Sequence, residues 1–474
     1  MIEQKSSNAY VKDLLLNNSV VILFVVLCVG SFFVSGTTLN YLLPELFIRI
    51  SRNTFMVLSL LIPVVAGLGL NFGIVVGAVA AQIAVFWVVY WGFSGFTGIL
   101  LCILICTPLA VLFGYGVGAL FNRMKGSEMI GGLVMGYFFD GLYQLLFLYI
   151  IGGIIPVSNP TMIIAGGIGV KNTIDLMGNL KYSLDNVPMI AILDVVFWIV
   201  IILTSIQLIY RLIKKQELRL KKALLVLSLA VIIYALSYVP ALSSFLSTDR
   251  LLLLNAIELG VLATCIYNIF RIIRRRKEYE TTGLPKKELL YIAVALAAYA
   301  ITYIPVFESA FVAVRLPVLT YICIGGLCVF MSWFLNTRLG QNMSTVGQSR
   351  TVATSSGINV DRTRIIAMIM STVLASYGQL ISLQNIGTFS TYGAHTQVGQ
   401  FAIAALLVGG ASVHRATTKQ AVLGVILFHT LFILSPLAGK ALFGNAQIGE
   451  YFRVFVAYGV IAMALALHAW RSKK

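Results

Sequence analysis

The amino-acid sequence predicts an all-α polytopic membrane protein with about 12–14 transmembrane helices, and its composition carries that prediction. Of the 474 residues, 59% are apolar and only 11% are charged, whereas soluble domains are near half apolar and a quarter charged. The mean hydropathy is +0.94. At roughly 20 residues per span, this composition supplies about a dozen helices or more. A soluble enzyme, a nucleic-acid-binding domain and a disordered regulator are therefore excluded as classes.

Uninterrupted apolar runs define the expected helices, because a stretch of this length and polarity is stable in the hydrocarbon core only as a helix. The run at 399–412 is short, so it is either a span or a re-entrant half-helix, and the number of spans near 385–412 stays open. If every run crosses the membrane, both termini lie on the same side. The runs cover 19–36, 53–70, 72–92, 94–121, 128–152, 186–210, 223–241, 249–270, 289–306, 315–335, 365–384, 399–412, 420–438 and 451–470.

The distribution of basic residues orients the chain in the membrane. With the N-terminus inside, 26 of the 34 Lys and Arg residues fall on inside segments, as the positive-inside rule requires. The sequence therefore predicts that both termini lie in the cytoplasm. The net charge of +17 is then a signal of topology and of contact with anionic membrane lipid, and no nucleic-acid partner is expected.

A tandem repeat lies in the middle of the chain, where residues 221–270 align with 286–335 without a gap. Two tyrosines, a proline and an arginine stay in register, which apolar composition alone does not produce. Tyr234 and Arg250 of the first copy correspond to Tyr299 and Arg315 of the second. We interpret 221–285 and 286–335 as a duplicated helical hairpin within a single transmembrane domain that spans residues 1–474.

Catalytic and cofactor chemistry finds no support in the sequence. No G-x-x-x-x-G-K-[ST] loop that would cradle a nucleotide is present. The histidines and cysteines have no metal-ligand spacing, and no nucleophile motif accompanies them. We expect a transport protein without an ATPase site of its own, with no catalytic residues, no metal site and no cofactor.

Polar groups within or between the apolar runs are the candidates for a solute pathway, since ionisable residues and irregular backbone at membrane depth usually line a cavity. Asp140 stands beside Tyr137 in an aromatic cluster that would suit a hydroxylated solute. A simple helix–helix hydrogen bond is the alternative role for Asp140.

Two glycine-rich or polar stretches have the composition of broken helices, which place solute groups near the bilayer midplane in transporters. The first contains Asn71 and Phe72, and the second contains Asn385 and Thr388. Ordinary loops just outside the bilayer would have the same composition. The predicted pathway residues are thus Asn71, Phe72, Tyr137, Asp140, Asn385 and Thr388.

A run of motifs from Thr337 to Ser412 resembles a known transporter family. It reads T-R-L-G from Thr337, S-G-I-N-V from Ser356 and L-V-G-G-A-S from Leu407. These motifs resemble the permease subunits of ATP-binding-cassette importers of the ribose, simple-sugar and nucleoside group. The resemblance is weaker over 67–82 and does not extend over the duplicated hairpin. Gln341 stands where the family usually has arginine, which leaves the solute group open.

The resemblance implies both a function and a set of partners. It implies an importer permease for a sugar, nucleoside or similar small polar solute, located in the cell inner (plasma) membrane. Cytoplasmic ATP-binding subunits would drive transport, an extracytoplasmic solute-binding protein would deliver the solute, and a second permease subunit would complete a homo- or heterodimer. The 336–364 segment would be the cytoplasmic coupling segment, and its coupling residues would be Arg338, Gly340, Gly347, Ala353 and Gly357. The alternative is a secondary transporter driven by an ion gradient.

Overall fold

The computed structural model describes residues 19–124, 126–157, 159–164, 168–214, 220–279 and 286–471. Several basic residues used for the orientation lie outside these ranges, among them Lys5, Lys12, Lys125, Lys473 and Lys474, as do residues 280–285 at the end of the first predicted hairpin copy. The chain forms two compact units. We call residues 1–183 with 323–474 the main unit, and residues 184–322 the hairpin unit.

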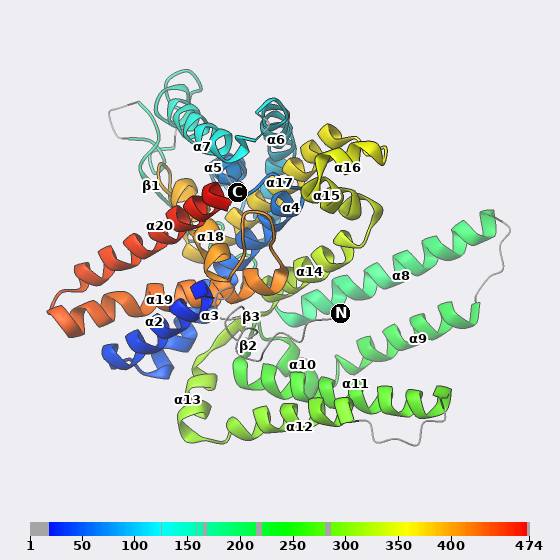
Figure 1. Ribbon diagram of the computed structural model, residues 1–474. Helices are drawn as coiled ribbons and strands as arrows, with labels where there is room; N and C mark the ends of the chain where they lie inside the picture. The colour runs from blue at the N-terminus through cyan, green and yellow to red at the C-terminus, as the bar shows by residue number, and fades with distance from the viewer. Residues whose placement is uncertain are drawn as a thin grey trace, which may run out of the picture. The chain divides into compact units, whose positions relative to one another are not determined.

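Helices make up most of both units (Figure 1). The main unit contains α2 (Ser19–Ser35), α3 (Leu39–Ser59), α4 (Leu61–Val65), η1 (Phe72–Ile74), α5 (Val75–Tyr90), α6 (Gly95–Arg123), α7 (Glu128–Leu145), η2 (Leu146–Ile150), β1 (Thr173–Asp175), α15 (Arg338–Gln348), α16 (Arg350–Ser355), α17 (Val360–Ile386), β4 (Thr388–Ser390), α18 (Ala394–Val408), α19 (Thr418–Phe443) and α20 (Ala446–Arg471). The hairpin unit contains α8 (Met189–Ile213), α9 (Leu220–Leu236), α10 (Pro240–Leu246), β2 (Arg250–Leu252), α11 (Leu253–Tyr279), α12 (Lys286–Ile301), α13 (Pro305–Ala313) and β3 (Arg315–Pro317), and α14 (Val318–Leu335) begins in it.

The predicted class, an all-α protein that crosses the membrane several times, is confirmed. Within the described residues, nine helices are long and apolar enough to span a bilayer, and a tenth forms if α12 and α13 are counted as one bent span. Three shorter apolar helices lie within α2, α9 and α18. Each of the fourteen predicted runs falls on a helix, and the short run at 399–412 overlaps α18.

One span begins much earlier than the apolar pattern indicates. The predicted run started at residue 53, but a span extends from Leu39 to Val65 and includes both Arg49 and Arg52, which the charge count had placed in an outside loop. Within this helix, Arg49 Nε donates to Glu45 Oε1 over 3.0 Å, one helical turn away. Because that pair neutralises the charge locally, the helix continues through residues that interrupt the hydropathy pattern.

Helix α17 is the centre of the main unit, where it contacts α3, α5 and α6 (Figure 1). Glycines allow the close approach of these helices. A Cβ atom at Gly77 of α5 would lie 2.5 Å from the Thr372 carbonyl oxygen, and one at Gly114 of α6 would lie 2.8 Å from the Ile369 Cα. Small residues at helix contacts are how membrane helices gain packing contacts without a hydrophobic driving force.

The two copies of the repeat have the same succession of elements: a helix, a short helix that begins with proline, a strand and a returning helix. The hydroxyls of Tyr234 and Tyr238 are 2.9 Å apart in the first copy. The corresponding hydroxyls of Tyr299 and Tyr303 are 2.7 Å apart in the second. Strands β2 and β3 pair antiparallel, which joins the two copies.

The predicted span at 289–306 is broken near its end. Helix α12 ends at Ile301, and α13 starts at Pro305 in a direction bent by 89°. Proline has no N–H to donate to the preceding turn, so it begins a helix more readily than it continues one. Within the hairpin unit, α8 packs on α9 and α11 packs on α12, as Figure 1 shows.

Candidate functional site

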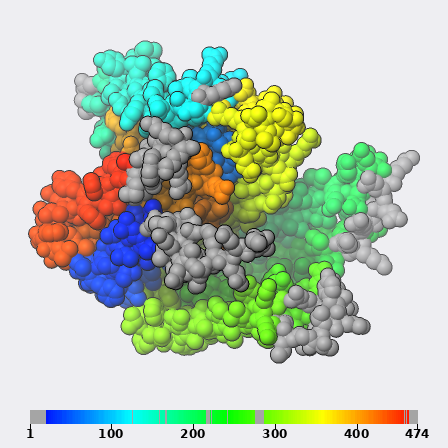
Figure 2. Space-filling view, in the orientation of Figure 1, coloured from blue at the N-terminus to red at the C-terminus, as the bar shows by residue number. Residues whose placement is uncertain are grey.

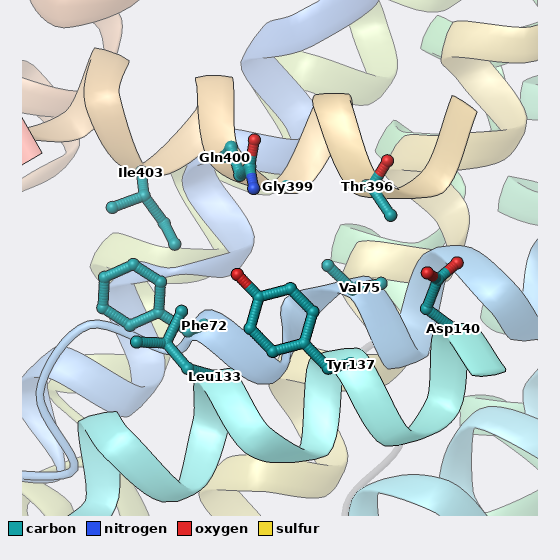
Figure 3. A pocket seen from close by; sticks show the side chains of 10 residues that line it. Phe72, Val75, Leu133, Tyr137, Asp140, Thr396, Gly399, Gln400 and Ile403 are labelled. Atoms are coloured by element: carbon teal, nitrogen blue, oxygen red, sulfur yellow. The ribbon is translucent and has the colours of Figure 1, made fainter. Parts of the chain in front are cut away.

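A pocket lies between α7 and α18 of the main unit, with η1 and the start of α5 as its floor (Figure 3). It holds about 490 Å³ of empty space, its open mouth included. The broken segment before α5 contributes Phe72, whose backbone packs against Gly132 and Gly136 of α7. A Cβ at Gly132 would lie 3.2 Å from the Gly73 nitrogen and would press α7 away from η1, whereas one at Gly136 would be in ordinary contact, 3.5 Å from the Phe72 carbonyl oxygen. The lining residues are Phe72, Val75, Leu133, Gly136, Tyr137, Asp140, Thr396, Gly399, Gln400 and Ile403.

Asp140 is the acidic residue of the pocket, and both of its carboxylate oxygens are engaged by side chains. His395 Nε2 lies 2.7 Å from Oδ1, and Gln144 Nε2 donates to Oδ2 over 3.2 Å. His395 is fully buried, whereas Asp140 is 23% exposed. An ionised carboxylate only accepts hydrogen bonds, so Nε2 is the donor whenever Asp140 is ionised. The carboxylate is therefore held in place and keeps acceptor capacity toward the pocket.

The opposite wall of the pocket offers neutral polar groups. Thr396 and Gln400 project from α18 toward Asp140 and Tyr137 of α7 (Figure 3). The Tyr458 hydroxyl donates to Gln400 Oε1 over 2.8 Å, which fixes the amide and leaves its NH₂ group as a donor. The ten lining residues thus include one acidic side chain, no basic one and two aromatic rings.

The predicted pathway residues are distributed over two places. Phe72, Tyr137 and Asp140 line the pocket together. Asn71 lies directly behind it, buried, with Nδ2 donating to Ser371 Oγ over 3.3 Å. Asn385 and Thr388 do not line this pocket, because Asn385 is at the end of α17 and Thr388 is in β4, opposite Asp175 of β1.

Several side chains at the pocket could not be predicted from the sequence. His395 is separated from Asp140 by 255 positions, and nothing in local spacing links them. The ring of Tyr143 lies 4.8 Å from that of His395, and its hydroxyl is buried without a partner in the described structure. In the sequence, only the polar composition of residues 385–397 pointed to His395 and Thr396, and it did so only by making them part of a stretch expected to be non-helical.

The predicted coupling residues separate into buried and exposed groups. Gly340 and Ala353 are buried, and a Cβ at Gly347 would lie 2.1 Å from the Val65 carbonyl oxygen. Arg338 and Gly357 are exposed. Gly347 therefore serves the packing of α15 against the segment after α4, and a bulky residue there would disturb this chain directly. Figure 2 shows α15 and α16 at the surface.

A pocket between membrane-spanning helices, lined by aromatic rings and a few fixed polar groups, is characteristic of a membrane permease. The family described as "Branched-chain amino acid transport system / permease component" matches residues 220–465, just over half of the chain, and the chain belongs to this family. The match includes the repeated hairpins, so the expectation that the resemblance would not extend over them is wrong.

A curated relative is the xylose transport system permease protein XylH of Haemophilus influenzae. It is 26% identical over 208 residues, which are 44% of this chain and 52% of the relative. The chain thus spans about half the length of this relative. No solved structure matches the chain. These similarities confirm the resemblance to permease subunits of ATP-binding-cassette importers.

Proposed function

We propose that the protein is the permease subunit of an importer for a neutral, hydroxylated solute of the size of a simple sugar, and that the α7–α18 pocket binds this solute on its way across the membrane. The observation that carries the proposal is the pairing of one fixed carboxylate, Asp140, with neutral donors and aromatic rings in a single pocket between spans. The family and the xylose permease relative support a solute transporter of this kind.

The comparisons leave two solute classes open, sugars and branched-chain amino acids, and the polar groups of the pocket favour sugars. A sugar hydroxyl can donate to the Asp140 carboxylate, and another can accept from the Gln400 amide. The Thr396 hydroxyl, which donates to the Gly393 carbonyl, can only accept from the solute, and the apolar face of the ring can lie on Phe72 or Tyr137. A branched-chain amino acid carries a carboxylate of its own. The ammonium group of the amino acid could pair with Asp140, but no lysine or arginine among the lining residues would pair with that carboxylate, and an unpaired charge inside a pocket is costly.

Energy for import is proposed to come from ATP hydrolysis on cytoplasmic ATP-binding subunits. The exposed residues of α15, of α16 and of the turn that follows α16, with Arg338 and Gly357 among them, would form the surface on which those subunits dock. A solute-binding protein would deliver solute from outside, and a second permease subunit would complete the pathway in the inner membrane. Family membership and the surface position of α15 and α16 support this arrangement.

An ion-gradient-driven transporter is the second candidate, and one observation favours it. A carboxylate–imidazole pair inside a membrane pocket, such as Asp140 and His395, can exchange a proton with a solute or with water. In that mechanism the pair would be an ion-coupling site, and transport would continue without ATP.

The solute class is tested by competition for uptake. Cells that carry the protein as their sole importer for d-xylose are given radiolabelled d-xylose with an excess of an unlabelled competitor. We expect neutral aldoses to suppress uptake and leucine to leave it unchanged, because no basic side chain lines the pocket to pair with the carboxylate of leucine. Suppression by leucine, together with poor competition by sugars, would assign the pocket to amino acids.

A further inference from the structure

A buried group of three charges joins the α15–α16 segment to α7, the helix that forms one wall of the pocket. Glu128, the first residue of α7, accepts from both Arg350 of α16 and Arg364 of α17 through the same oxygen, Oε1. Its other oxygen accepts from the Gly126 N–H over 2.9 Å. Two guanidinium groups thus share one carboxylate.

The two arginines differ in their environment. The Arg364 side chain is fully buried, and the Nε and Nη1 atoms have no partner in the described structure. The Arg350 side chain is 37% exposed. An exposed guanidinium can exchange its carboxylate for water at little cost, whereas a buried one cannot. The Arg350–Glu128 contact is therefore the separable one, and the Arg364–Glu128 contact is permanent.

Helix α7 gives this contact a route to the pocket. It runs unbroken from Glu128 to Leu145, and Tyr137 lies nine residues above Glu128, roughly 14 Å along the axis. A second contact leads to the floor of the pocket, because the Gly347 backbone lies against Gly67, five residues before Phe72. A displacement of α15 and α16 would therefore act on both α7 and η1, the elements that carry Tyr137, Asp140 and Phe72.

We propose that Arg350 is a coupling residue, whose reversible contact with Glu128 transmits movement of the docking segment to the α7 wall of the pocket. This inference rests on the proposed ATP-driven function. In one state Arg350 holds the start of α7 to α16. In the other it turns to solvent, while Glu128 keeps its pair with Arg364, so the start of α7 is released without leaving an unpaired buried charge.

The test replaces the separable partner only. Arg350→Gln removes the charge but leaves the Glu128–Arg364 pair intact, so we expect the protein to be recovered from membranes in the wild-type amount. Arg123→Gln is the matched control, because Arg123 is an exposed arginine at the end of α6, outside the 336–364 segment. Arg350→Lys keeps the charge and should rescue part of the effect.

The readout is the ratio of d-xylose imported to ATP hydrolysed, measured in proteoliposomes with the complex that co-purifies with tagged permease from its native cells. We expect Arg350→Gln to keep ATP hydrolysis and to lower the ratio about 2- to 30-fold, the range seen for residues that carry coupling between sites. The Arg123→Gln variant should keep the wild-type ratio.

Three results would overturn the inference, each for a different reason. A wild-type ratio in Arg350→Gln would show that the contact does not transmit coupling. Reduced recovery of Arg350→Gln from membranes would show that Arg350 serves folding, which also contradicts the proposal. If the wild-type complex itself imports d-xylose without ATP hydrolysis, the proposed function is wrong, and the coupling role is wrong with it.

Discussion

Replacing Asp140 with Asn or Leu should lower d-xylose uptake by roughly 10- to 100-fold, the cost of losing hydrogen bonds to a charged group. The carboxylate is the acceptor that His395 and Gln144 hold in the pocket. Asn keeps the shape but offers one acceptor oxygen, while Leu also leaves the buried His395 without its partner. We therefore expect uptake to fall with either variant and membrane recovery to fall with Leu alone.

The control for this change is Asp194→Asn. Asp194 is also an acidic residue within a span, on α8 of the hairpin unit, and it does not line the pocket. Uptake should stay within about twofold of wild type, since exchanging one polar side chain outside the site usually has a small effect. Equal losses for Asp140 and Asp194 would argue that intramembrane carboxylates serve only assembly.

Replacing Gly347 with Ala should both destabilise the permease and reduce transport. The new Cβ would lie 2.1 Å from the Val65 carbonyl oxygen and 2.9 Å from the Gly67 nitrogen. Neither backbone atom can move like a side chain, so α15 must shift away from the segment that leads to Phe72. Overpacking of this kind costs about 1–3 kcal/mol and occasionally more, which thermal unfolding in detergent would detect.

Gly116→Ala is the matched control, because a Cβ at Gly116 of α6 meets nothing within 4 Å. Alanine is favoured over glycine inside a helix by roughly 1 kcal/mol, so the control should unfold at the same temperature or slightly higher. If Gly347→Ala were as stable and as active as wild type, the contact between α15 and the segment after α4 would not matter for transport.

The helical membrane class was predictable because it depends on composition, and each predicted apolar run falls on a helix. The start of a helix at Leu39 was not predictable, since Arg49 and Arg52 interrupt the hydropathy pattern of that helix. What permits those charges is the Glu45–Arg49 pair, an interaction of side chains that a hydropathy average ignores. Local pairing thus determined where this span begins.

Three of the ten residues that line the pocket were predictable from the sequence. Asp140 stood out because an ionisable group at membrane depth is costly without a function, Tyr137 as its aromatic neighbour, and Phe72 as part of a stretch that interrupts a helix. His395 and Gln400 did not, because they meet the pocket only after α18 has packed beside α7. The same holds for Glu128 and Arg364, which are 236 positions apart and pair only in the folded chain.

The glycine motifs near α15 illustrate a further limit. Their resemblance to the family predicts a coupling region, but the structure gives Gly340 and Gly347 a different reason to be small, because backbone lies against them on their own chain. The residues of this segment that face outward are others, such as Arg338 and Val352. A motif thus identifies the segment, whereas burial decides which of its members can touch a partner.

The most direct test of the account compares the energy sources for uptake. Uptake of radiolabelled d-xylose would be measured in cells treated in one of two ways. In one arm arsenate depletes ATP while the proton gradient is maintained. In the other a protonophore removes the gradient while glycolysis maintains ATP. An ATP-driven importer predicts that arsenate abolishes uptake and the protonophore leaves it nearly intact. Uptake that survives ATP depletion and collapses with the protonophore would contradict the account and assign Asp140 and His395 to ion coupling.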